Sequence, residues 1–337
     1  MDISKEKRNN KVVIDHLLYS LMAPINVGGQ AVIEGVMMRS PKAMSIAVRR
    51  PDGEVIVKKK KWVSLSERIP ILRWPFFRGS LVLIEAMLNG IEALNFSAKQ
   101  QEESPQESDQ SNNSSSNIST YLTIALAISL ALLLFVVIPH VASRVLLILL
   151  GSKAGLGSIT FNLIDASIKL FLFLGYIALI GCIPDIKRVF AYHGAEHRSI
   201  YTFESGEELT VANAQQHSTL HPRCGTSFII VVLMVSIVIF AVTFQYIQLS
   251  NIHPIIRGIL AILIKLGLMI PIAGISYEII RFAGSPIGKW ASFLVAPGLL
   301  VQKLTTRIPT DDQMEVAICA LKAALEMESS ISQKTSD

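Results

Sequence analysis

The stretch Phe228-Ile-Ile-Val-Val-Leu-Met-Val-Ser-Ile-Val-Ile-Phe-Ala-Val-Thr-Phe-Gln-Tyr-Ile-Gln-Leu249 contains no charged residue. A helix of this length can cross the roughly 30 Å hydrocarbon core of a bilayer. Three more apolar runs of similar length are Tyr121–Ile138, Leu163–Ile183 and Ile255 to about Ile280. The sequence therefore predicts an α-helical integral membrane protein with about four transmembrane helices.

Composition and charge placement support a multi-pass membrane protein. Charged residues make up 17% of the chain, below the roughly 25% of soluble domains. With four crossings, 26 of the 31 lysines and arginines fall on one side, and only Arg144, Lys153 and Arg257 lie in the opposite loops. By the positive-inside rule, we expect a protein of the cell (inner) membrane with both termini in the cytoplasm. Contact with the bilayer and its anionic head groups accounts for the net charge of +5, so no nucleic-acid partner is needed.

The regions before the first crossing differ in composition. Residues 1–98 are predicted to form an N-terminal cytoplasmic module. It would contain a small β unit, since β-branched runs at 43–48 and 54–57 flank the turn residues Pro51-Asp-Gly53. The apolar but charge-bearing segment 76–88 predicts a helix that lies at the membrane interface or packs on the bundle. Residues 99–119 are rich in Gln, Glu, Ser and Asn and predict a disordered linker.

The remaining chain divides into two parts. Residues 120–310 are expected to form the membrane domain, with a cytoplasmic His-rich loop at 184–226. Residues 311–337 predict a C-terminal amphipathic helix, at 311–327, and a tail. Three cysteines at scattered positions indicate no disulfide framework.

Two motifs in the N-terminal module allow two interpretations each. The glycines of Val27–Arg39 favour either a tight turn in a small sheet or a backbone that approaches a site closely. The basic run Lys58–Lys61 is either the solvated end of a strand or a contact for anionic lipid head groups.

The chemistry-bearing residues gather just before the uncharged run. His193, Glu196 and His197 form a His-x-x-Glu-His string. On a helix the two histidines share a face, with the glutamate beside them. This is the inverted zincin pattern, in which two histidines hold a metal and the glutamate takes a proton from water.

Further candidate ligands follow within thirty residues. His221 and Cys224 occur in His-Pro-Arg-Cys-Gly-Thr, where Pro222 predicts a turn. Together with His193 and His197 they would form a tetrahedral site of the kind that zinc prefers. His217 would replace His221 as a ligand, or contact the ligands without binding the metal itself.

Three other charged sites fall inside the apolar runs. Glu278 is either a further ligand or the ion-pair partner of Arg281, three residues on. Asp165 and Lys169 are expected to pair, four residues apart. Lys265 interrupts an apolar run, where a buried charge is costly; its long side chain can snorkel outward, so we do not place it in the site.

The number of ligands separates two functions. Three protein ligands leave a position for water and permit hydrolysis with Glu196 as general base, whereas four close a structural zinc site. The leading hypothesis is a membrane-embedded, metal-dependent, hydrolase-like enzyme with an unknown substrate. His193, His197 and His221 would hold a divalent ion, zinc by its donors, and Cys224 or Glu278 would complete the shell. The alternatives are a non-catalytic scaffold with a structural zinc site and, with less support, a transporter that uses Lys265.

Four strings of this sequence resemble the YqhQ-like family of bacterial membrane proteins: Val27–Arg39, Tyr192–His197, His221–Thr226 and Ser276–Glu278. The resemblance extends from about residue 26 to about residue 310. It implies a bacterial inner-membrane protein, and the family carries the general label of predicted metal-dependent enzyme. It implies no substrate and no ligand set.

Overall fold

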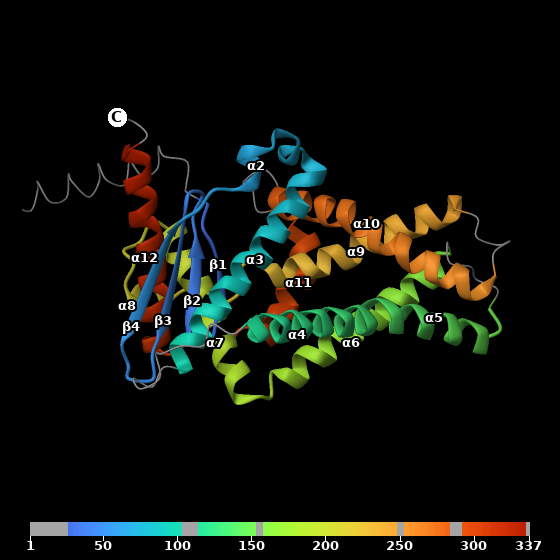
Figure 1. Ribbon diagram of the computed structural model, residues 1–337, viewed down its shortest axis with the longest axis horizontal. Coiled ribbons are helices and arrows are strands. Elements are labelled where there is room, and N and C mark those ends of the chain that lie inside the picture. The colour runs from blue at the N-terminus through green and yellow to red at the C-terminus, as the bar shows by residue number, and fades with distance from the viewer. Residues whose placement is uncertain (1–25, 103–113, 153–157, 248–252, 284–291, 335–337) are drawn as a thin grey trace, which may run out of the picture.

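The N-terminal part of the chain forms a four-stranded antiparallel sheet (Figure 1). The computed structural model describes residues 26–102, 114–152, 158–247, 253–283 and 292–334. The strands follow chain order: β1 (Gly28–Val32), β2 (Gly35–Arg39), β3 (Ala43–Arg49) and β4 (Val55–Lys61). The predicted small β unit is therefore confirmed and is larger than expected.

Two tight turns set the register of this sheet. Ala47 pairs with Val57 across the predicted β3–β4 hairpin, and Gly53 in its turn has a φ of 92°. The β1–β2 hairpin turns through Ile33 and Glu34, and Glu34 has a φ of 51°. Left-handed backbone of this kind is typical of two-residue hairpin turns. The first glycine-rich interpretation, a tight turn in a small sheet, thus holds for this segment.

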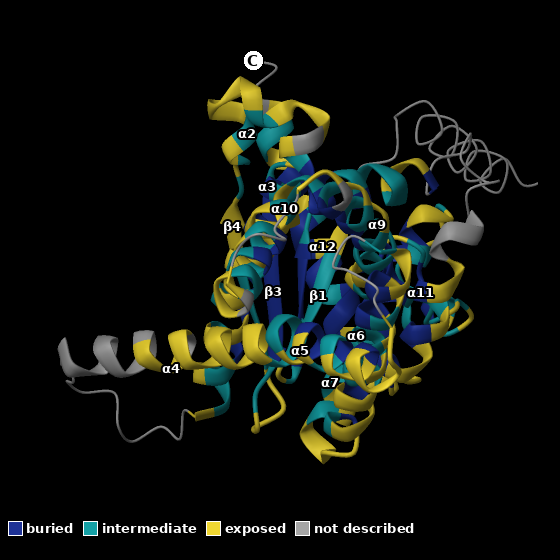
Figure 2. Ribbon diagram, turned by 90° about the vertical axis from the view of Figure 1, so that its right-hand side faces the viewer, coloured by how far each residue is buried: buried dark blue, intermediate teal, exposed yellow. Residues whose placement is uncertain are grey.

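Helices cover both faces of the sheet. One face, including Met37 and Ile46, packs on Ala93 of α3 (Pro75–Glu102). The other face packs on α7 (Pro184–Glu204) and α12 (Asp311–Lys334). Figure 2 shows the resulting dark-blue buried core around the strands. Because both faces are covered, six of the seven residues of β3 are buried.

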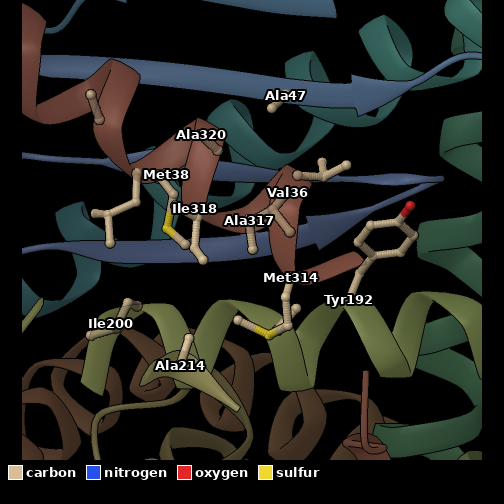
Figure 3. Packing of buried hydrophobic residues seen from close by; sticks show 14 of the residues in the cluster. Val36, Met38, Ala47, Tyr192, Ile200, Ala214, Met314, Ala317, Ile318 and Ala320 are labelled. Atoms are coloured by element: carbon tan, nitrogen blue, oxygen red, sulfur yellow. The ribbon is translucent and has the colours of Figure 1, made fainter. Parts of the chain in front are cut away.

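The C-terminal helix is part of this core. Figure 3 shows Met314 and Ala317 of α12 between the strands and α7. Both side chains are fully buried, and Ser45 of β3 donates a hydrogen bond to the carbonyl of Ala320 at 2.5 Å. The predicted amphipathic helix thus lays its apolar face on the N-terminal sheet.

The rest of the described chain is mainly a bundle of apolar helices. It contains α4 (Ser114–Leu132), a π-helical turn η2 (Leu133–Val137), α5 (Ile138–Leu149), α6 (Ile159–Ile180), α9 (Gly225–Tyr246), α10 (Pro254–Ala283) and α11 (Ser292–Thr305). Short helices α2 (Leu65–Arg68), η1 (Pro70–Arg73) and α8 (Val211–Ala214) connect the longer elements. Figure 1 shows the bundle extending away from the sheet.

Five helices of the described chain are long and apolar enough to cross a membrane, where we expected about four. They comprise Phe77–Glu102, Ala125–Leu149, Ile159–Ile180, Gly225–Phe244 and Ile255–Ala283. The additional one is α3, which has the lowest mean hydropathy of the five, 1.3. The protein is therefore a mostly helical membrane protein with a small N-terminal sheet.

The segment predicted as a linker is only partly described. Helix α3 extends to Glu102 and α4 begins at Ser114. Residues 103–113 lie outside the described residues, so disorder between these helices stays a prediction.

Candidate metal centre

Helix α7 presents His193 and His197 on one face. Pro184 begins the helix, where its missing N–H costs no hydrogen bond. Beside the two histidines on the helix, Tyr192 and Ile200 form a face that packs toward the sheet and α12 (Figure 3). With that face held in the core, the two imidazoles lie side by side, with ring centroids 4.4 Å apart.

Gly194 lets the chain after α11 approach this helix closely. A Cβ at residue 194 would lie 2.1 Å from the carbonyl oxygen of Arg307. The amide of Arg307 also donates a hydrogen bond to the carbonyl of Phe190 at 2.9 Å. Only glycine fits at position 194, because any side chain there would collide with the backbone of Arg307.

Cys224 meets the two histidines from another element. It is the N-cap of α9, and its sulfur accepts a hydrogen bond from the Thr226 amide at 3.4 Å. His193 Nε2 lies 3.2 Å from Cys224 Sγ. One potential ligand atom from each of His193, His197 and Cys224 lies within 4.8 Å of the others.

Backbone carbonyls hold both imidazoles in one orientation. His193 Nδ1 lies 2.8 Å from the carbonyl oxygen of Thr305, and His197 Nδ1 lies 2.5 Å from that of Thr219. A carbonyl only accepts, so each Nδ1 carries the hydrogen and each Nε2 is free to bind. Histidines that ligate metals are usually fixed in this way.

Burial of the site disfavours the charged form of His197. Burial lowers the pKa of His197 below its ordinary value. Its side chain is 2% exposed, while His193 is partly exposed. Metal binding requires a neutral imidazole, which is the form that this environment favours.

The donor set fits a zinc-like ion. Zinc binds nitrogen at about 2.0 Å and sulfur at about 2.3 Å, so tetrahedral geometry separates the two donors by roughly 3.5 Å. The 3.2 Å between His193 Nε2 and Cys224 Sγ is close to that separation. Two imidazoles and a thiol can therefore converge on one borderline divalent ion with small side-chain movements.

Glu196 is buried beside this group. Its side chain is 5% exposed and accepts a hydrogen bond from the backbone of Gly29 in β1. Burial raises the pKa of Glu196, while the neighbouring His193 and His221 act in the opposite direction. A carboxyl group of raised pKa is suited to exchange protons near neutral pH.

The structure keeps His221 apart from the three-residue group. Its ring centroid lies 5.7 Å from that of His197, and its Nε2 is 3.4 Å from Glu204. Gln302 of α11 holds its backbone, accepting from the His221 amide at 2.8 Å and donating to the carbonyl at 2.7 Å. Arg223 pairs with the same Glu204.

His217 lies outside the group as well. It is 3.1 Å from Glu207 and stacks on Tyr201 with ring centroids 6.1 Å apart. Tyr201 in turn contacts the His221 ring edge-on. His217 therefore supports His221 through Tyr201 and contacts neither histidine of the group in the described contacts.

Glu278 is occupied elsewhere. Both of its carboxylate oxygens accept from the guanidinium of Arg78 in α3. We expected Arg281 as the alternative partner, but Arg281 is exposed in the last turn of α10. An arginine two hundred residues away in sequence takes its place, which sequence spacing cannot indicate.

Several supporting residues were not foreseen as parts of the site. Gly29 belongs to the glycine-rich stretch, and its contact with Glu196 agrees with the second interpretation of that stretch. The carbonyls of Thr219 and Thr305 carry no sequence signal, since any residue offers a backbone carbonyl. Nor does the sequence around Gln302 indicate that its side chain contacts His221.

Comparisons with known proteins match most of the chain. The family model described as "Protein of unknown function (DUF1385)" matches residues 74–327. The uncharacterized protein YqhQ of Bacillus subtilis (strain 168) is 34% identical over 312 residues, which cover 90% of this chain and 94% of that protein. No solved structure matches.

Proposed function

Because this chain belongs to the DUF1385 family of proteins of unknown function, we propose its function from the geometry alone: a membrane-embedded, metal-dependent, hydrolase-like enzyme. The relative of 34% identity bears out the resemblance to the YqhQ-like family. The observation that carries the proposal is the convergence of His193, His197 and Cys224 beside a buried glutamate.

Three protein ligands favour an open site over a closed one. His193, His197 and Cys224 would hold the ion, zinc by the softness of its donors. A bound zinc ion would supply Lewis acidity and lower the pKa of water at its remaining position. His221, turned toward Glu204, leaves that position free.

The chain's own residues would bind, orient and move protons. The Thr305 and Thr219 carbonyls keep both Nε2 atoms directed inward. Glu196 would take a proton from the attacking water and return it to the leaving group, since its raised pKa suits both steps. The closeness of Gly29 shields that carboxyl from bulk water.

The distribution of charge supports a site at the cytoplasmic surface of the inner membrane. The side that carries 26 of the 31 basic residues includes both termini and α7. Helix α3 packs on α10 through Ser80 and on the sheet through Ala93, so we treat it as a helix packed on the bundle and not as a fifth crossing. A substrate would then be a membrane peptide or a lipid-linked molecule reached from that surface.

Anionic head groups are the proposed partners of this surface. Lys58 and Lys60 pair with Glu92, and Lys59 pairs with Glu326. Lys61 is exposed at the end of β4, close to Trp62 in sequence. Lipid contact by the basic run would therefore depend mainly on Lys61.

A structural zinc site is the second candidate, because His221 lies near enough to become a fourth ligand if its side chain rotates. Its ring lies 5.7 Å from His197, so a rotation away from Glu204 would bring it toward the ion as a fourth ligand. Such a site would join α7 to the start of α9 and leave no place for water.

Metal analysis of the purified full-length protein tests the proposal. We expect about one zinc per chain in the wild type, less in His193→Ala and Cys224→Ser, and wild-type content in Glu196→Gln. His253→Ala, an exposed histidine just before α10, serves as the matched control. X-ray absorption should show the zinc bound by one sulfur, two imidazole nitrogens and one oxygen from water.

Two results would contradict the enzyme. Absence of stoichiometric metal in the wild type removes the centre altogether. A spectrum with three imidazoles and one sulfur would identify His221 as fourth ligand and favour the structural site instead.

A further inference from the structure

A buried ionic cluster lies inside the bundle, on the far side from the sheet. Asp165 Oδ2 accepts from Lys169 Nζ at 2.7 Å and from Lys265 Nζ at 3.0 Å. Lys265 Nζ also lies 3.2 Å from His140 Nδ1. The side chains of Lys265 and Asp165 are 3% and 2% exposed. The predicted Asp165–Lys169 pair is present, but Lys265 points inward and does not snorkel.

This cluster holds one more positive than negative charge. In the described parts of α4, α5, α6, α9 and α10, the acidic residues are Asp165 and Glu278, and Glu278 is paired with Arg78. One carboxylate therefore faces two ammonium groups. Uncompensated charge in a hydrocarbon environment is costly and marks a functional site by default.

An apolar cavity adjoins the two lysines. It has a volume of about 370 Å³ and is lined by Lys169, Lys265 and side chains of η2, α6, α9 and α10. This volume lies at the lower end of the roughly 300–1,000 Å³ of ligand pockets. Phe135 and Val136 reach it from the π-helical turn. Such turns occur frequently at functional sites.

The charged cluster and the cavity follow one another in the same direction along α6 and α9. Asp165 lies six residues from the far end of α6, about 9 Å at the rise of a helix. Phe173 lines the cavity two turns nearer the sheet. On α9, Phe240 lies at the level of Lys265, since Lys265 Nζ is 5.2 Å from the centroid of the Phe240 ring. Ile229 lines the cavity near the start of the same helix, at the sheet end.

We propose that this cavity binds a single-chain amphiphile whose head group is a phosphate monoester. Its head would lie at Lys169 and Lys265, and its chain would extend toward Ile229. A phosphate monoester carries a charge of about −1.5 to −2 near pH 7 and three acceptor oxygens. It therefore offsets the excess positive charge of the cluster and can accept hydrogen bonds from both ammonium groups at once. A carboxylate brings a single charge and two acceptor oxygens.

Binding of three ligands of one chain length tests this assignment. Full-length protein in nanodiscs of zwitterionic lipid is titrated with tetradecyl phosphate, tetradecanoate and tetradecanol. We expect the phosphate to bind saturably and about tenfold or more tightly than the alcohol, since a buried charge pair contributes that much or more. The carboxylate should fall between them.

Three variants locate the site. Lys169→Gln should weaken binding of the phosphate by about tenfold or more and leave the alcohol unchanged. Ser236→Leu fills the cavity without altering charge, so it should weaken both ligands. Arg257→Gln removes a basic residue of α10 that does not line the cavity and should change neither. Thermal unfolding of each variant confirms that it remains folded.

A photoreactive group at the end of the chain tests the direction. Adducts at Ile229 or Ile230 support the assignment. Equal affinity for phosphate and alcohol, or wild-type affinity in folded Lys169→Gln, overturns it. Equal affinity for phosphate and carboxylate overturns the phosphate head group. Saturable binding to none of the three removes the site. These results do not depend on a metal at His193.

Discussion

Gly29 in β1 and Glu196 in α7 are in direct contact, because a Cβ at residue 29 would lie 2.8 Å from Cγ of Glu196. That Cβ would also lie 2.8 Å from the carbonyl oxygen of Met37. The sheet thereby forms one wall of the candidate metal centre. The N-terminal module and the His-rich helix are thus one structural unit, although Gly29 and Glu196 are 167 residues apart in sequence.

Gly29→Ala should destabilise the protein and displace Glu196. The added methyl group meets both a side chain and a carbonyl, and overpacking of this kind costs about 1–3 kcal/mol. Thermal unfolding in detergent measures the loss. Gly28→Ala is the matched control, since nothing lies within 4 Å of a Cβ there. Equal unfolding temperatures for both variants would contradict the contact.

His193→Ala and His221→Ala should differ in metal content. His193 Nε2 faces Cys224 Sγ, whereas His221 Nε2 faces Glu204. We therefore expect zinc to be lost from the first variant and retained by the second. Inductively coupled plasma mass spectrometry after dialysis measures both. If His221→Ala loses as much zinc as His193→Ala, His221 is a ligand and the open site is wrong.

Stability should fall in acid partly through Glu204. Burial acts to raise the pKa of Glu204, but the hydrogen bond with His221 and the charge of Arg223 outweigh it and hold the pKa below its ordinary value. A depressed carboxyl pKa contributes stability above the unfolded value of about 4.5, and this contribution is lost as the pH falls through the folded pKa.

Denaturant unfolding between pH 7 and pH 3 checks this expectation. Glu204→Gln should show a shallower decrease of the unfolding free energy below about pH 4.5 than the wild type does. Glu208→Gln, an exposed neighbour in sequence, should behave like the wild type. Parallel curves for Glu204→Gln and the wild type would rule out the contribution.

Glu278→Gln should lower stability without changing the metal content. Its carboxylate is joined to Arg78 by two hydrogen bonds, and both side chains are about 30% exposed. A double-mutant cycle with Arg78→Gln should give a coupling of about 1 kcal/mol, the upper value for partly exposed pairs. Loss of zinc in Glu278→Gln would instead return Glu278 to the candidate ligands.

Much of the architecture follows from patterns along the chain. Four apolar runs predicted membrane helices, because sufficient length and hydrophobicity are all that a helix needs to cross a bilayer. The turn at Pro51–Gly53 predicted the β3–β4 hairpin, since turn chemistry is local. The spacing of His193 and His197 predicted their common face, because a helix repeats every 3.6 residues.

Other features depend on which distant segments meet. No local pattern indicates that α12 lies on the sheet, or that Glu278 pairs with Arg78 and not with Arg281. Similarly, His221 and Cys224 looked equivalent as ligands, yet Gln302 and Glu204 turn only His221 away. From the sequence, Lys265 could reach the membrane surface, but in the structure the helices around Asp165 enclose its side chain. Periodicity describes the face of one helix, whereas the neighbour of that face is chosen by packing and charge pairing across the whole fold, and these act over hundreds of residues.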